Sequence, residues 1–77
     1  MFRTLIKTTT LAIDDRSYAV RYFEARTPRG GRRYSAEIVL NGMDRFILDD
    51  DSLSSLETRT TRVVPATLES RTLMKTA

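Results

Sequence analysis

Between residues 18 and 49 apolar side chains recur at every second position within three runs, and after Ser52 they recur at the spacing of an α-helix. Alternation with a period of two is typical of a strand that buries one face, whereas recurrence every three or four residues is typical of an amphipathic helix. This order favours an α+β fold. We predict a three- or four-stranded antiparallel meander sheet, with residues 18–49 as its meander and a C-terminal helical segment at residues 51–74 packed on one face.

Turn-forming residues mark the connections within the predicted sheet. Residues 28–32 read Pro-Arg-Gly-Gly-Arg, a strong loop signal, and residues 41–44 contain Asn-Gly, a frequent hairpin dipeptide. Register can then be chosen so that the apolar side chains of neighbouring strands share one face. The registers that satisfy this condition pair Thr27 with Arg33 and Leu40 with Phe46.

The N-terminal residues 1–17 are open to two interpretations, a strand or an arm. If Ile13 pairs with Tyr18 across a four-residue turn, a fourth strand joins the edge of the sheet. A helix is disfavoured by the three threonines at positions 8–10, because β-branched side chains lose rotamers in a helix. The sequence therefore favours a strand in this segment.

The start of the helical segment follows a run of three aspartates. Carboxylates can hold Mg²⁺ or Ca²⁺, but strand alternation places Asp49 and Asp51 on one side and Asp50 on the other. We therefore expect helix capping by Asp51 rather than a metal site. Farther along, Pro65 is expected to kink or split the helix, because proline lacks the amide hydrogen and clashes with the preceding turn.

The chain has 77 residues, no cysteine, no histidine and a formal net charge of +3 at pH 7. This length supports one small domain over residues 1–77. The missing side chains exclude disulfides, thiol nucleophiles and imidazole bases, so we expect no enzyme, no catalytic residue, no cofactor and no metal. A chain this short buries a limited core, which favours a homodimer or another partner. No apolar run suits a membrane span or signal peptide, so we predict a cytoplasmic protein without a membrane partner.

Of the 13 basic residues, 11 are arginines, and four of them gather around one predicted loop. This loop region contains two glycines and no acid, and Tyr34 lies beside it. Guanidinium groups bind phosphate bidentately, so an arginine-rich hairpin tip suits the backbone of a nucleic acid. The plain alternative is a solvated loop whose charges keep the hairpin soluble. The first hypothesis is therefore nucleic-acid binding by Arg26, Arg29, Arg32 and Arg33.

The sheet face opposite the predicted core mixes apolar and charged side chains. It is too apolar for a plain solvent face and too charged for a buried one, and such a surface suits a partner. An ordinary exposed face with a few apolar side chains is the alternative. The second hypothesis is a protein-interaction or homodimerisation module that uses Ala19, Phe23, Val39 and Ile47, interleaved with Arg21, Ser35, Glu37 and Arg45.

The segment from Tyr18 to Val64 resembles the three-stranded-sheet-plus-helix DNA-binding domains of plant ethylene-response factors and of phage-integrase arm-binding modules. The shared features are a basic first hairpin, Ala36-Glu37-Ile38 in the second strand, and the Arg45–Leu48 stretch before an acid-rich helix start. The tryptophans of that family are absent here, and Glu37 on the exposed face would repel phosphate. The resemblance implies contacts to the DNA major groove from Arg21, Arg26, Arg29, Arg33 and Arg45.

Overall fold

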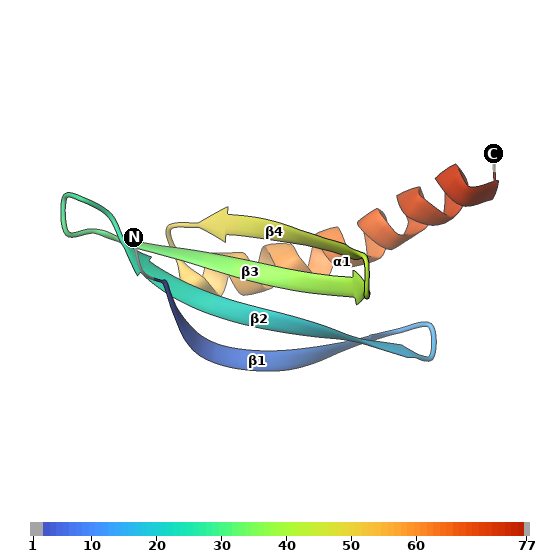
Figure 1. The fold of residues 1–77 in the computed structure, drawn as a ribbon, viewed down its shortest axis with the longest axis horizontal. Coiled ribbons are helices and arrows are strands. Elements are labelled where there is room, and N and C mark those ends of the chain that lie inside the picture. The colour runs from blue at the N-terminus through green and yellow to red at the C-terminus, as the bar shows by residue number, and fades with distance from the viewer. Residues whose placement is uncertain (1–2, 77) are drawn as a thin grey trace.

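A computed structural model describes the backbone of residues 3–76 and the side chains of residues 3–70. Four strands form one antiparallel sheet in the order β1-β2-β3-β4, and a single helix follows them (Figure 1). The predicted α+β fold is confirmed, with the N-terminal segment as the fourth strand; its first two residues lie outside the described part. The elements are β1 (Arg3–Ile13), β2 (Arg16–Arg26), β3 (Arg32–Asn41), β4 (Asp44–Asp50) and α1 (Leu53–Thr76).

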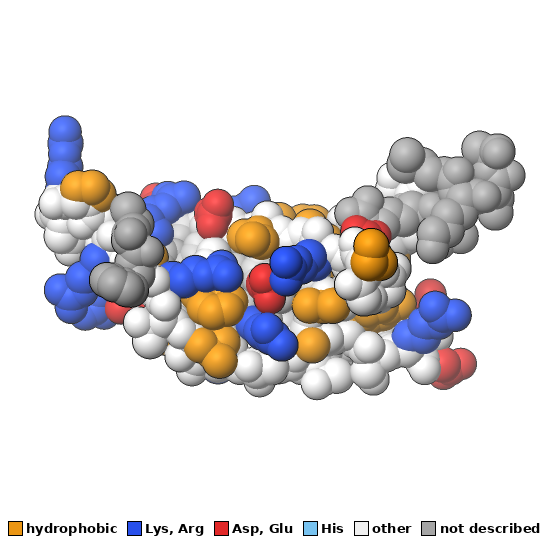
Figure 2. All heavy atoms as spheres, viewed as in Figure 1, with side chains coloured by type: hydrophobic (Ala, Val, Ile, Leu, Met, Phe, Trp, Pro, Cys, Tyr) orange, Lys and Arg blue, Asp and Glu red, His pale blue; other side chains and the backbone are white. Residues whose placement is uncertain are grey.

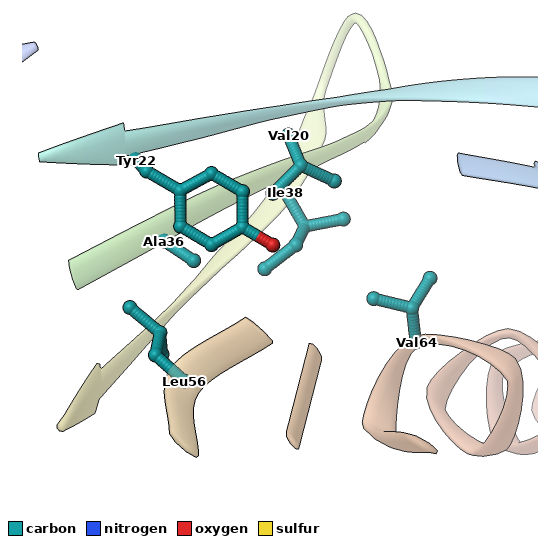
Figure 3. Close-up of a cluster of buried hydrophobic side chains, with 6 residues drawn as sticks. All are labelled: Val20, Tyr22, Ala36, Ile38, Leu56 and Val64. Carbon is teal, nitrogen blue, oxygen red and sulfur yellow. The ribbon is translucent and has the colours of Figure 1, made fainter. Parts of the chain in front are cut away.

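The core lies between α1 and one face of the sheet, where α1 packs against β3 and β4. The even-numbered positions of β2 and β3 face α1, as the period-two pattern predicted. Each member of the central cluster is at most 4% exposed (Figure 3). This cluster consists of Val20, Tyr22, Ala36, Ile38, Leu56 and Val64.

β1 and β2 are joined by a two-residue turn, which is tighter than the predicted four-residue turn. Ile13 lies opposite Arg16, so the predicted pairing of Ile13 with Tyr18 was wrong. Asp14 and Asp15 have φ values of 50° and 67°, the left-handed values that a type I′ hairpin turn requires at both central positions. Aspartate tolerates this conformation better than most residues, because its short side chain can hydrogen-bond locally.

Replacing Asp14-Asp15 by Asn-Gly is expected to raise the free energy of unfolding by about 1 kcal/mol, because glycine adopts positive φ without a steric penalty. Urea unfolding of the double variant measures this gain. The single change Asp15→Ala serves as the opposite control and should lower stability, since alanine at positive φ is strained. A midpoint that does not move in either protein would contradict the assignment of this turn.

The other two registers are also displaced by two residues from the predicted ones. Val20 lies opposite Ile38 instead of Leu40, and Ile38 lies opposite Phe46 instead of Leu48. The displacement arises because the β2–β3 loop begins one residue earlier than predicted and the β3–β4 connection is a two-residue turn. A shift of two residues leaves every side chain on its original face, so the predicted core face is correct although the predicted pairs were wrong.

The helix α1 begins at a cap formed by Ser52. The Ser55 N–H donates to Ser52 Oγ at 3.4 Å, and Asp50 accepts from the Ser52 N–H at 3.2 Å and from the Ser55 hydroxyl at 2.9 Å. Asp51, the predicted cap, is paired with Arg33 instead. The prediction was wrong by one residue because β4 continues to Asp50, which leaves Ser52 directly before the first helical residue.

Asp50→Asn is expected to reduce the dependence of stability on pH in acid. The hydroxyl of Ser55, the amide of Ser52 and the guanidinium of Arg59 stabilise the charged carboxylate and lower the pKa of Asp50. A carboxyl whose pKa is lowered by folding contributes stability above its ordinary pKa, and this contribution is lost as the pH falls through the lowered value. Wild-type unfolding free energy should therefore fall more steeply below about pH 4 than that of the variant.

Urea titrations at a series of acidic pH values test this expectation. Ser55→Ala provides the matched comparison, because it removes the largest cause of the lowered pKa and keeps the carboxyl of Asp50. Its pH dependence should lie between those of the wild type and Asp50→Asn. Three parallel profiles would show that Asp50 has no part in acid unfolding.

Pro65 lies within α1 without dividing it, so the predicted split into two helices does not occur. The residue is exposed while the preceding Val64 is fully buried, which places the proline ring away from the core. The last turns of α1 project beyond the ends of β3 and β4 (Figure 1). Together with the long hairpins, this projection gives the molecule an elongated outline of 45 × 22 × 22 Å.

Candidate nucleic-acid interface

The sheet face turned away from α1 has no other element packed over it in the described part of the chain, and we call it the open face. Figure 2 looks onto this face and shows hydrophobic side chains among basic ones, with acidic side chains between them. Strand alternation and the observed register assign its residues. They are Arg3, Leu5, Thr8, Thr10 and Ala12 of β1, Ser17, Ala19, Arg21, Phe23 and Ala25 of β2, Arg33, Ser35, Glu37 and Val39 of β3, and Arg45, Ile47 and Asp49 of β4.

Glu37 lies near the centre of the open face between two arginines from the neighbouring strands. Arg21 Nη1 is 3.6 Å from Glu37 Oε1, and Arg45 Nη1 is 3.7 Å from Glu37 Oε2. The Glu37 side chain is 8% exposed, whereas those of Arg21 and Arg45 are 54% and 69% exposed. The carboxylate is thus buried beside two guanidinium groups that remain open to solvent. The cluster as a whole carries one net positive charge.

Apolar side chains flank this cluster. Ile47 is 51% exposed and Leu5 is 52% exposed, while Phe23 is half-buried beneath Arg3, whose guanidinium carbon lies 4.1 Å from the ring centroid. Sequence reasoning missed Leu5 and Arg3 because it left the pairing of the N-terminal segment open. The four residues of the predicted interaction face lie together here: Ala19, Phe23, Val39 and Ile47.

The loop of the β2–β3 hairpin is held in shape by hydrogen bonds around Thr27. The Thr27 N–H donates to the Gly31 carbonyl at 2.8 Å, and the Gly30 N–H donates to the Thr27 carbonyl at 2.9 Å. The Gly31 N–H also donates to Thr27 Oγ1 at 3.0 Å. Gly30 has a φ of 85°, which an L side chain rarely adopts. The loop therefore presents the exposed Arg29 from an ordered turn.

Arg26 and Arg32 lie directly opposite each other at the base of this loop. Like charges at directly opposite strand positions destabilise a hairpin. Arg32 Nε is 3.9 Å from Glu24 Oε1, a weak compensation, and Arg26 makes no ion pair within residues 3–70. Arg29 likewise has no acidic partner in that range. Positive charge is therefore concentrated at the tip of the hairpin.

The six arginines predicted from the sequence do not converge on one flat surface. Three of them, Arg21, Arg33 and Arg45, lie on the open face, and Arg33 is paired with Asp51. The other three belong to the hairpin end, where strand alternation turns Arg26 and Arg32 toward the α1 side and the loop carries Arg29 at its tip. The result is a basic surface that extends from the open face around the end of the hairpin.

The described residues give little support for a metal site or a membrane-spanning helix. No group of three or more acidic side chains within them is placed to hold a metal ion. The acidic side chains near the arginines, such as Glu24 and Glu37, are engaged in ion pairs. As for membranes, the described part of α1 is not both long enough and apolar enough to cross one.

Comparison with known proteins identifies no relative of this chain. No protein-family model, no curated protein and no solved structure matches it. The function of the open face and the hairpin therefore rests on their own geometry and charge.

Proposed function

We propose that this protein is a non-enzymatic nucleic-acid-binding module that contacts phosphates with arginines of the open face and of the β2–β3 hairpin. The observation that carries the proposal is the cluster of Arg21, Glu37 and Arg45, in which one buried carboxylate lies within 3.7 Å of two exposed guanidinium groups. Side chains that are held before binding lose less rotamer freedom when they bind. Guanidinium groups also match phosphate bidentately.

The distribution of charge supports the same proposal. Seven arginines lie on the open face and the hairpin, against four carboxylates, and the rest of the sequence has six basic and six acidic residues. The residues of this surface therefore sum to +3, which suits a polyanion, and the remaining charged residues of the sequence sum to zero. The arginines are Arg3, Arg21, Arg26, Arg29, Arg32, Arg33 and Arg45, and the carboxylates are those of Glu24, Glu37, Asp49 and Asp51.

From the sequence, Glu37 was expected to repel phosphate. Its surroundings in the structure support a different role. Its carboxylate is covered, and the two guanidinium groups beside it lie on the solvent side. An approaching phosphate would therefore meet Arg21 and Arg45 before it meets Glu37. We infer that Glu37 positions the two arginines rather than excluding an anion.

The hairpin provides a second point of contact in this proposal. A phosphate placed between Arg26 and Arg32 would relieve the repulsion between two guanidinium groups that lie opposite each other. Arg29 extends the same positive surface at the tip of the ordered loop. Backbone contacts of this kind give affinity and orientation without base specificity.

The alternative use of the open face is an interaction with a protein. A second copy stacked face to face is disfavoured, because it would bring two positively charged surfaces together. An acidic protein surface would match both the arginines and the apolar residues Phe23, Val39 and Ile47. This alternative predicts binding of acidic polypeptides as well as of nucleic acids, so the two can be separated.

A titration followed by amide chemical shifts tests the proposal. Short mixed-sequence duplex DNA and single-stranded RNA are added at low salt, and poly-glutamate of equal charge is added in a parallel series. We expect shifts of the amides around Arg21, Glu37 and Arg45 and in the hairpin loop with at least one nucleic acid. Poly-glutamate should bind at least about tenfold more weakly, because it lacks flat bases and closely spaced phosphates.

Two results would overturn the proposal. The first is the absence of shifts on the open face with either nucleic acid at low salt. The second is equal or tighter binding of poly-glutamate at the same residues, which would favour an acidic protein as the partner. Shifts confined to α1 would also contradict the proposed surface.

A further inference from the structure

We propose that β1 pairs edge to edge with β1 of a second copy of this chain, forming a homodimer with one continuous sheet. β1 is an outer strand of the sheet and pairs with β2 alone. The main-chain groups along its other side therefore have no strand partner in the described part of the chain. Such an edge is a template for a further strand. This inference is independent of the proposed binding of nucleic acid.

The two edges of the sheet differ in how they are protected. β4, the other outer strand, carries four charged residues in seven, at positions 44, 45, 49 and 50, and α1 packs against it. β1 has six consecutive residues, Thr8–Ile13, with no charge, no proline and no glycine. Charged side chains, prolines and covering elements are what keep natural strand edges from pairing. The edge at Thr8–Ile13 has neither charged side chains nor prolines, and residues 3–10 of β1 are exposed.

Lys7, the charged residue directly before this segment, is turned away from the edge, and the acidic residues Asp14 and Asp15 follow the segment in the turn to β2. Lys7 is paired with Glu57 of α1, and its Nζ lies 5.2 Å from the centroid of the Tyr22 ring. The pairing of β1 with β2 is irregular between Leu5 and Lys7, which marks a β-bulge. Bulges interrupt edge pairing. The regular, unguarded edge therefore runs from Lys7 to Ile13.

This segment is complementary to itself, which is why a second copy is the expected partner. A two-fold axis perpendicular to the sheet at Thr10 would make the two β1 strands antiparallel and would bring no like charges opposite each other. It would also cover Leu11 and Ile13, which are partly buried at the margin of the core. Both open faces would lie on the same side of the joined sheet. The pairs across the axis would be Lys7 with Ile13, Thr8 with Ala12 and Thr9 with Leu11.

Sedimentation equilibrium over a wide range of protein concentration tests the proposal. We expect the wild type to change reversibly from the monomer mass to twice that mass. Thr10→Lys should weaken the association at least about tenfold, because it places two like charges opposite each other at the axis. Thr61→Lys is the matched control, since it adds the same charge at an exposed position of α1. Its association should equal that of the wild type.

Hydrogen exchange of the backbone amides is a second measurement, and it distinguishes a loss of association from a loss of folding. In the wild type, amides of β1 that point outward should exchange more slowly at dimer concentrations than at monomer concentrations, while amides of β3 should not change. The proposal is overturned if the wild type stays monomeric at millimolar concentration, or if Thr10→Lys, shown to be folded by its amide spectrum, dimerises as the wild type does. Loss of association in Phe23→Ser but not in Thr10→Lys would instead place the contact on the open face.

Discussion

Ile38→Ala is expected to lower the free energy of unfolding by about 2–5 kcal/mol. Ile38 is fully buried, and its side chain belongs to the cluster that joins the sheet to Leu56 and Val64 of α1. Truncation loses the burial of three carbon atoms and leaves a cavity that the rigid sheet can fill only in part. A domain of this length has a total stability of about 4–12 kcal/mol, so this single change removes a large share of it.

Ile47→Ala is the matched control for this prediction. Ile47 lies on β4 with its side chain on the open face and is 51% exposed, so the same three carbon atoms leave an uncovered surface. The expected loss is below about 1 kcal/mol. Urea unfolding of both variants at one pH measures the difference. Equal losses would show that the face turned away from α1 is covered in solution, or that Ile38 is not in the core.

If Ile38→Ala does not fold, the graded substitution Ile38→Val keeps the prediction measurable. Removing one carbon atom there should cost about 0.5–1.5 kcal/mol. Ile47→Val should cost close to nothing, because surface substitutions rarely exceed about 0.5 kcal/mol. A larger effect at Ile47 than at Ile38 would reverse the assignment of the two faces.

The double change Arg21→Gln with Arg45→Gln is expected to weaken binding of nucleic acid about 10–100-fold at low salt. Each guanidinium group lost removes one charged contact to phosphate, and two such contacts contribute about 1.4–2.8 kcal/mol together. The change is also expected to lower stability, because it removes both cationic partners of the buried Glu37 carboxylate, so the amide spectrum must first show that the variant is folded. The measurement is fluorescence anisotropy of a labelled nucleic acid, in the form that gives amide shifts with the wild type.

Arg16→Gln with Arg62→Gln is the control for total charge. Arg16 follows the β1–β2 turn and Arg62 lies on α1, and both are exposed positions away from the open face. This variant loses the same two positive charges and should bind within about threefold of the wild type, because distant charges are screened. Equal losses in the two double variants would show that net charge alone, rather than the open face, decides binding.

The alternation of apolar residues was enough to predict the strands and their faces, but it could not fix the register. Side chains repeat every two residues along a strand, so a shift of two residues satisfies the same pattern. The geometry of the turns determines which of these registers the strands adopt. Asp14-Asp15 adopts a left-handed turn without glycine, which the composition of the turn did not indicate.

Because the register was ambiguous, the sequence did not predict the ion-pair cluster of Arg21, Glu37 and Arg45 at the centre of the candidate site. In the predicted registers Glu37 would lie opposite Phe23 and Asp49, so no arginine would lie directly opposite it. In the observed registers Glu37 lies opposite Arg21 on β2 and opposite Ile47 on β4, and Arg45 lies two residues from Ile47 on the same face. The arginines could therefore be predicted individually from the sequence. The cluster in which Glu37 pairs with Arg21 and Arg45 became apparent only from the strand pairing.

The salt dependence of affinity tests the central claim, that Arg21 and Arg45 contact phosphate, most directly. Each phosphate contact to a duplex contributes about 0.9 to the slope of log affinity against log salt concentration. We expect the slope for Arg21→Gln with Arg45→Gln to be smaller than that of the wild type by about 1.8, or by about 1.4 with a single strand. The control Arg16→Gln with Arg62→Gln should keep the wild-type slope. An unchanged slope in the open-face variant would contradict the claim.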